Sequence, residues 1–208
     1  MHTVVVRVWL PDRPGALGQV ASRIGAVRGD VLGIEILETG GGRVIDELVV
    51  AIDDTKLIDL LVHEVGSVDG VSVEHVRQID GDRIDPDLIA LTLGAELAEA
   101  AAPDRLRVLC NGLMRVADAE WSAVVRDGTL VETAGTVPDQ AWLHAFLAGS
   151  VHLDGSSGSG GSAPSDLVWA HLDRAGVAVA AGRRARPVHE RERVRVALLA
   201  RVADALLA

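Results

Sequence analysis

A bend rich in proline and glycine, Asp12-Arg-Pro-Gly-Ala-Leu17, follows an alternating apolar segment at residues 4–9. Pro14 fixes its own φ, and Gly15 allows the backbone to approach a ligand closely. The amides in the first turn of the following helix have no helical acceptors, and they attract a carboxylate. Asp12 can cap that helix or accept an ammonium group. The bend predicts a small-molecule site; the alternative is that Asp12 only caps and Gly15 only turns the chain.

The elements around this bend follow the order βαββαβ. Period-two and helical apolar patterns predict strands at residues 4–9, 31–38, 44–52 and 71–76, and helices at 17–27 and 54–65. This order is typical of a ferredoxin-like domain with two helices on one face of a four-stranded sheet. The other face and one edge strand then need a partner, which predicts a homodimer.

Residues 1–79 resemble the ACT domain, on the motif Asp12-Arg-Pro-Gly-Ala-Leu17 between the first strand and the first helix. The resemblance implies a regulatory module that binds an amino acid or similar effector between paired domains. It implies effector contacts from Asp12, Arg13, Pro14, Gly15, Ala16 and Leu17, and from Asp30 and Val31 at the start of the second strand. Members that bind amino acids often have Gly-x-Asn there, whereas this chain has Gly29-Asp-Val31, so an apolar side chain replaces an amide.

A polar linker at residues 80–87 separates this region from a second domain at residues 88–208. Its pattern predicts helices at 88–101, 106–114, 142–147 and near the C-terminus, and strands at 121–126, 130–134, 167–172 and 177–181. The element order, together with the segment 183–194 that passes into the last helix, resembles the GAF domain, which implies an α+β sensor with an antiparallel sheet and flanking helices. The Gly/Ser loop at 154–163 then either covers a ligand pocket or lies solvated.

The remaining reactive residues do not assemble an active site. His144, His152 and His171 lack the spacing of metal ligands, and Cys110 lies at an apolar helical position that favours a buried thiol. The only lysine in the sequence is Lys56, so no phosphate-binding loop of the lysine type is present. The sequence therefore predicts a protein that is not an enzyme and holds neither a metal nor a cofactor.

Charge excludes some partners. The 208 residues include 30 acidic and 20 basic side chains, a net charge of −10, which opposes nucleic-acid binding. Seven arginines at residues 183–201 interleave with Glu190 and Glu192, which predicts a solvated or dimer-facing helix surface. No apolar run is long enough to cross a membrane, and no secretion signal opens the chain, so we expect a cytoplasmic protein without membrane contact.

Together these observations predict a non-catalytic regulatory protein that binds an amino-acid effector at an ACT-type dimer interface. The second domain would sense another ligand or pass the change to a regulated protein partner. The alternative is an assembly or scaffold protein that uses the ACT-like unit for dimerisation without a ligand, because Val31 replaces the amide.

Overall fold

The computed structural model describes residues 1–79, 85–150 and 165–208. The chain divides into two compact units, Met1–Arg83 and Ile84–Ala208. This division falls within the predicted linker at 80–87, although the first helix of the second unit already begins at Pro86. The predicted Gly/Ser loop at 154–163 and His152 lie outside the described residues.

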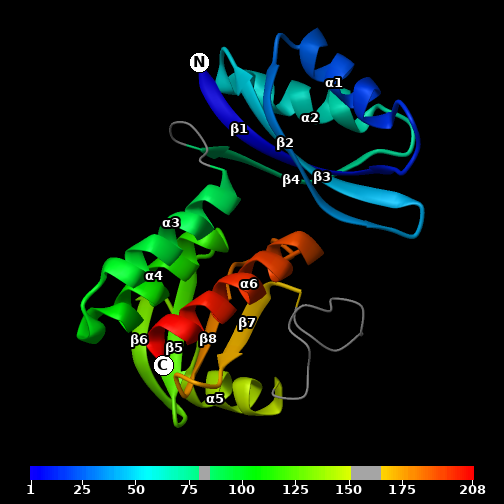
Figure 1. Ribbon diagram of the computed structural model, residues 1–208. Coiled ribbons are helices and arrows are strands. Elements are labelled where there is room, and N and C mark those ends of the chain that lie inside the picture. The colour runs from blue at the N-terminus through cyan, green and yellow to red at the C-terminus, as the bar shows by residue number, and fades with distance from the viewer. Residues whose placement is uncertain (80–84, 151–164) are drawn as a thin grey trace. The chain divides into compact units, whose positions relative to one another are not determined.

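Unit 1 has the predicted βαββαβ order (Figure 1). Its elements are β1 (His2–Pro11), α1 (Ala16–Ala26), β2 (Asp30–Gly40), β3 (Arg43–Ile52), the 3₁₀ helix η1 (Thr55–Leu57), α2 (Ile58–Gly66) and β4 (Ser72–Ile79). The strands form one antiparallel sheet in the order β2-β3-β1-β4. Helices α1 and α2 cover the same face of this sheet, so the ferredoxin-like prediction is confirmed.

Strand alternation builds the core of unit 1. Every second residue of β1, from Val4 to Leu10, faces the helices and is buried against Val20 and Ile24 of α1 and Leu61 of α2. The chain leaves this layer at the end of β1, where the amide of Asp12 donates to the carbonyl of Gly42 at 3.0 Å. This hydrogen bond ties the bend to the turn between β2 and β3.

The other face of the unit 1 sheet combines buried apolar side chains, such as Val5 and Ile45, with buried charged ones. Arg7 is buried and donates two hydrogen bonds to Glu47, from Nε at 3.1 Å and from an Nη at 2.7 Å. Trp9 donates from Nε1 to Glu74 at 2.9 Å, and the guanidinium of Arg43 lies 5.6 Å from the Trp9 ring centroid. Because a buried charge needs a partner, these pairs allow charged side chains on the central strands.

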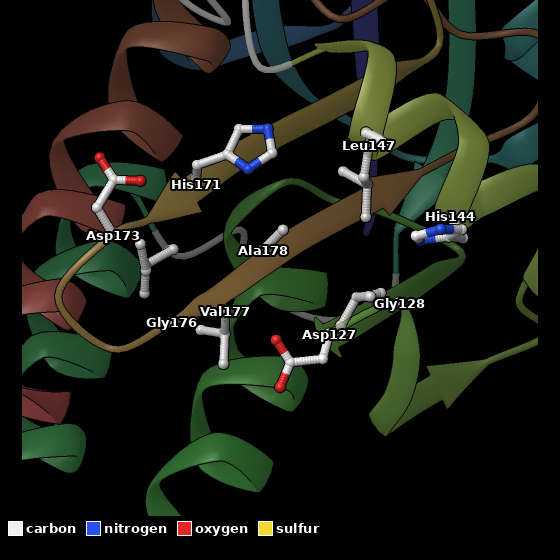
Figure 2. Close-up of a pocket in the computed structure, with 12 residues that line it drawn as sticks. Asp127, Gly128, His144, Leu147, His171, Asp173, Gly176, Val177 and Ala178 are labelled. Carbon is white, nitrogen blue, oxygen red and sulfur yellow. The ribbon is translucent and has the colours of Figure 1, made fainter.

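Unit 2 is an antiparallel four-stranded sheet with helices on both faces. Its elements are α3 (Pro86–Glu99), the 3₁₀ helix η2 (Ala102–Asp104), α4 (Arg105–Val116), β5 (Trp121–Arg126), β6 (Thr129–Gly135), α5 (Gln140–Gly149), β7 (Leu167–Leu172), β8 (Val177–Gly182) and α6 (Glu190–Leu207). The sheet order is β6-β5-β8-β7. Helix α5 lies over the face that carries Ala178, where Leu143 and Leu147 pack against Trp169 (Figure 2).

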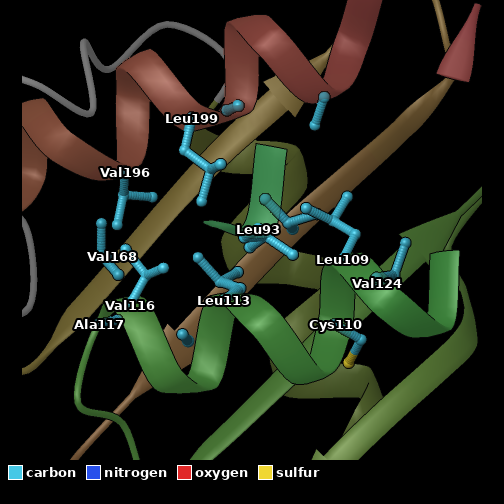
Figure 3. Packing of buried hydrophobic residues seen from close by; sticks show 14 of the residues in the cluster. Leu93, Leu109, Cys110, Leu113, Val116, Ala117, Val124, Val168, Val196 and Leu199 are labelled. Carbon is cyan, nitrogen blue, oxygen red and sulfur yellow. The ribbon is translucent and has the colours of Figure 1, made fainter. Parts of the chain in front are cut away.

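Helices α3, α4 and α6 cover the opposite face of this sheet. Leu93, Leu113 and Leu199 from the three helices meet Val124 and Val168 from the strands (Figure 3). Cys110 of α4 belongs to this core, and burial raises the pKa of its thiol. The prediction of a buried thiol is therefore confirmed.

The prediction that the seven arginines at residues 183–201 form a solvated or dimer-facing surface is wrong for the three that are buried, namely Arg183, Arg193 and Arg195, whereas Arg184, Arg191 and Arg201 are exposed. Arg183 is buried and donates to the carbonyls of Ala117 and Pro187 at 2.9 and 2.6 Å, and to Glu192 at 2.7 Å. Arg193 is also buried and donates to the carbonyl of Leu167 at 2.9 Å. These guanidinium groups find acceptors in loops and strand ends that the linear sequence does not identify.

Candidate functional site

The bend after β1 is exposed and open. Residues 12–15 are exposed, and Gly15 is the N-cap of α1 with a φ of 85°. A Cβ added at Gly15 would meet nothing within 4 Å, so none of the described side chains, its two chain neighbours left aside, occupies that space. The left-handed φ explains the glycine, because other residues adopt it at a cost.

The first turn of α1 has no side-chain cap, so of the two roles considered for Asp12 the helix cap is not observed. The carbonyl of Arg13 accepts from the amide of Ala16 at 3.2 Å, and the carbonyl of Gly15 accepts from Gln19 at 3.1 Å. The amides of Leu17 and Gly18 lie between these two donors and receive no side-chain acceptor. A carboxylate placed beside Gly15 would meet these amides and the positive end of the helix dipole.

Arg13 lies apart from the other residues of the bend. Its guanidinium is 3.4 Å from Oε1 of Gln19, and it lines a hollow with Ser22, Arg23 and Asp69. Asp69 follows α2, so this hollow lies on the α2 side of α1, away from β2.

The other predicted contacts, Asp30 and Val31, lie at the far end of the sheet. Pro11 pairs with Arg43 of β3, whereas Val31 pairs with Val50 of the same strand. These partners are seven residues apart, which corresponds to roughly 24 Å along an extended strand. Asp30 is exposed, and Val31 packs against the apolar core beneath the helices. One copy of unit 1 therefore does not bring the two halves of the predicted site together.

Strand β2, which carries Asp30 and Val31, forms one edge of the sheet. Three of its apolar side chains are about half exposed: Leu32 at 52%, Ile34 at 49% and Ile36 at 49%. Ile34 pairs with Leu48 and Ile36 with Asp46, so these two isoleucines lie on the helix side of the sheet, beside α1. Exposed apolar residues on an unpaired edge are typical of an association surface.

Asp46 is a functional candidate that the sequence reasoning missed. Its cross-strand partner Val8 belongs to the core beneath the helices, so Asp46 faces the same layer and is 2% exposed. Because α1 connects β1 to β2, which flank β3, the helix crosses over β3 and over this carboxylate. Oδ1 has no hydrogen-bond partner among the described residues, and burial raises the pKa of Asp46. The sequence feature that could have identified Asp46 is an acidic residue at an inward-facing position of an otherwise apolar strand.

The other candidate groups show no metal-binding cluster where the structure describes them. No group of three His, Cys, Asp or Glu side chains lies close enough to hold a metal ion within residues 1–79, 85–150 and 165–208. His144 and His171 line a cavity in unit 2. In the same described ranges, no helix has the length and apolar character that crossing a membrane requires.

Comparisons with known proteins find similar solved structures. Neither a protein-family model nor a curated protein matches the sequence significantly. An ACT domain protein from Streptococcus pneumoniae is similar at 16% identity over 37% of this chain and 89% of that chain, with a TM-score of 0.32. The ACT domain of GTP pyrophosphokinase from Chlorobium tepidum is similar at 18% identity over 38% and 100% of the two chains, with a TM-score of 0.31.

An unknown protein from Galdieria sulphuraria is similar at 14% identity over 56% of this chain and 92% of that chain, with a TM-score of 0.36. Scores of this size do not establish a family, so the fold of unit 1 rests on its own element order and sheet order. The comparisons give no support to the GAF-like assignment of unit 2.

Proposed function

We propose that this chain is a non-catalytic regulatory protein whose unit 1 is an ACT-type module that binds an amino-acid effector between two copies. The observation that carries the proposal is the open, uncapped bend at Gly15 at the start of α1. A backbone that offers free amides beside empty space is suited to a small carboxylate.

Pairing of two β2 edges would complete the site. In an antiparallel pair of β2 strands related by a two-fold axis, the start of β2 in one copy lies beside its end in the other. Gly40, at the end of β2, pairs with Arg43, which pairs with Pro11 next to the bend. The start of β2, with Asp30, would then approach the bend of the second copy. Such a dimer holds two equivalent sites, each built from both copies.

The charges of the two halves fit a zwitterion. The amides of Leu17 and Gly18 would bind the effector carboxylate, while the exposed carboxylates of Asp12 and of Asp30 from the second copy would bind its ammonium group. Asp46 beneath α1 adds negative potential on the same side of the sheet. Val31 presents no hydrogen-bonding side chain there, so recognition depends on the backbone amides and the carboxylates.

Regulation follows if the effector favours one arrangement of the two copies. Because the site is divided between copies, the effector binds the paired form better than the separate copies, and this difference in affinity shifts the population toward pairs. We propose that unit 2 transmits this shift to a protein partner. Its assignment as a GAF-like sensor rests on the order of its elements and on the segment 183–194, which passes into α6.

An assembly protein without an effector is the second candidate function. The observation that favours it is Val31, which places an apolar side chain where amino-acid-binding relatives often carry an amide, and which packs into the core. In this alternative the β2 edge still pairs, and the bend at Gly15 only reverses the chain.

Ligand-induced stabilisation tests the first candidate. We expect one of the twenty amino acids, at millimolar concentration, to raise the melting temperature of the full chain by several degrees. The corresponding amine without a carboxylate, and the N-acetylated amino acid, should have no effect, because each lacks one of the two charges. Asp12→Asn and Asp30→Asn should each weaken binding, while Asp53→Asn, an exposed acidic residue of the same unit, serves as the matched control.

If none of the twenty amino acids raises the melting temperature and the chain is nevertheless a dimer, the effector proposal is overturned and the assembly function remains. A response that survives both Asp12→Asn and Asp30→Asn would contradict the proposed site.

A further inference from the structure

Unit 2 contains a cavity of about 280 Å³ that the proposed function does not use. It lies on the α5 side of the sheet, at the end where two hairpins turn (Figure 2). Asp127 and Gly128 from the turn between β5 and β6 form one side, and Asp173 from the turn between β7 and β8 forms another. His144 of α5 and His171 of β7 complete the polar lining.

The lining combines apolar side chains with acidic and neutral polar groups. The apolar lining comes from the sheet face under α5 (Val125 and Ala178), from α5 itself (Leu147), and from the ends of β7 and β8 (Leu172 and Val177), which also belong to the core on the other face. Among the described residues that line the cavity, two are aspartates and none is a lysine or arginine. An apolar lining of this kind favours an apolar body, and the two carboxylates favour a positive charge at its edge.

The hydrogen bonds of Ser150 indicate which ring nitrogen of His171 can accept a hydrogen bond. Ser150 has a single hydroxyl proton, and its Oγ donates to the carbonyl of Leu147 at 2.9 Å. The contact of 3.2 Å between Oγ and Nε2 of His171 therefore has His171 as donor. In the neutral ring this tautomer leaves Nδ1 as an acceptor, which suits an N–H donor from a ligand.

The acidic edge at Asp127 is held in place by the local backbone. Asp127 and Gly128 have φ values of 49° and 76°, and they form the two-residue connection between the paired residues Arg126 and Thr129. The His144 ring lies against this turn, because a Cβ on Gly128 would come within 2.8 Å of its Cε1. Close packing of helix α5 on the turn keeps this side of the cavity preformed.

The polar groups surround the cavity without converging on one point. Within residues 1–79, 85–150 and 165–208, no three His, Cys, Asp or Glu side chains are close enough to share a metal ion. A small organic molecule can contact several separated groups at once, whereas a single ion binds groups that converge on one point. We propose that this cavity binds a small organic cation, a primary ammonium group on a short apolar chain.

A titration of the full chain with n-butylammonium tests this site. We expect backbone amide NMR shifts to change at residues 127–128, 144–148 and 171–178, because these segments line the cavity. Pentanoate and 1-butanol have the same butyl chain with negative or no charge, and both should bind at least tenfold more weakly. Binding at a different set of residues, or equal binding of butanol, would overturn the proposal.

Variants then separate charge from shape. Asp127→Asn and Asp173→Asn should each weaken n-butylammonium binding several-fold, and asparagine tolerates the left-handed φ of residue 127. Ala178→Leu should abolish binding by filling the cavity without changing charge. Glu99→Gln, an exposed acidic residue at the end of α3, is the control for net charge and should bind normally. Undiminished binding by the double aspartate variant would overturn the proposal.

Discussion

A carboxylate buried among aliphatic side chains destabilises a fold unless a donor or a cation reaches it. Asp46 is such a residue, since it is 2% exposed and its Oδ1 has no partner among the described residues. Burial raises its pKa above the ordinary value of 3.8. The ionised form is therefore less favourable in the folded chain than in the unfolded chain, and the destabilisation is complete above the raised pKa.

Asp46→Asn should stabilise unit 1 at neutral pH by about 1 kcal/mol, because the amide has the same shape without the charge. The advantage should shrink as the pH falls through the raised pKa toward 3.8, because Asp46 itself becomes neutral. Hydrogen exchange of the β1 and β3 amides at pH 7.5 and pH 5 measures the free energy of opening locally. Asp53→Asn is the control. A loss of stability in Asp46→Asn at pH 7.5 would mean that the carboxylate of Asp46 has a stabilising partner.

At the scale of elements, β2 differs from the other strands of unit 1 in its exposure. The central strands β1 and β3 are buried along most of their length, whereas β2 alternates exposed and half-buried residues at the sheet edge. The edge presents backbone groups without a neighbouring strand, and Ile34 and Ile36 add apolar area beside it. Pairing with a second copy would cover both.

Ile34→Lys combined with Ile36→Lys should convert the dimer to a monomer, because like charges would face each other across the two-fold axis. Both side chains are about half exposed, so the fold itself should tolerate the change. Sedimentation velocity measures the outcome. Leu60→Lys, on the exposed surface of α2 in the same unit, is the matched control and should stay dimeric. A dimer that survives the double variant would place the contact elsewhere.

At the scale of the whole molecule, the two units have separate cores and are expected to respond separately to association. If only unit 1 pairs, raising the protein concentration should stabilise it and leave unit 2 unchanged. Once most of the protein is dimeric, each tenfold increase in protein concentration should raise the free energy of global opening by about 0.7 kcal/mol per protomer. Hydrogen exchange measures the amides of β1 and β3 in unit 1 separately from those of β5 and β8 in unit 2 in the same experiment. An equal response in both units would contradict pairing through unit 1 alone.

Local patterns account for the parts of the fold that were predicted correctly. The alternation of Val4, Val6 and Val8 has the period of a strand, and Asp127-Gly128 has the chemistry of a tight hairpin turn. The bend at Gly15 was also predicted as a turn into a helix. The sequence left two roles open for Asp12, and the structure does not show the capping role, because a cap depends on where the side chain points after the chain has turned.

The sequence by itself determined the order of the elements, their inward faces and the glycine-containing bend, because each depends on residues close together in the chain. Only the tertiary structure decided that Arg183 and Arg193 are buried, since their acceptors come from distant loops and strands. It also decided that Asp12 and Asp30 lie at opposite ends of one sheet, and that Asp46 has a buried oxygen with no partner in the part of the chain that the structure describes. Strand register and long-range packing set these relations, and neither is encoded in local periodicity.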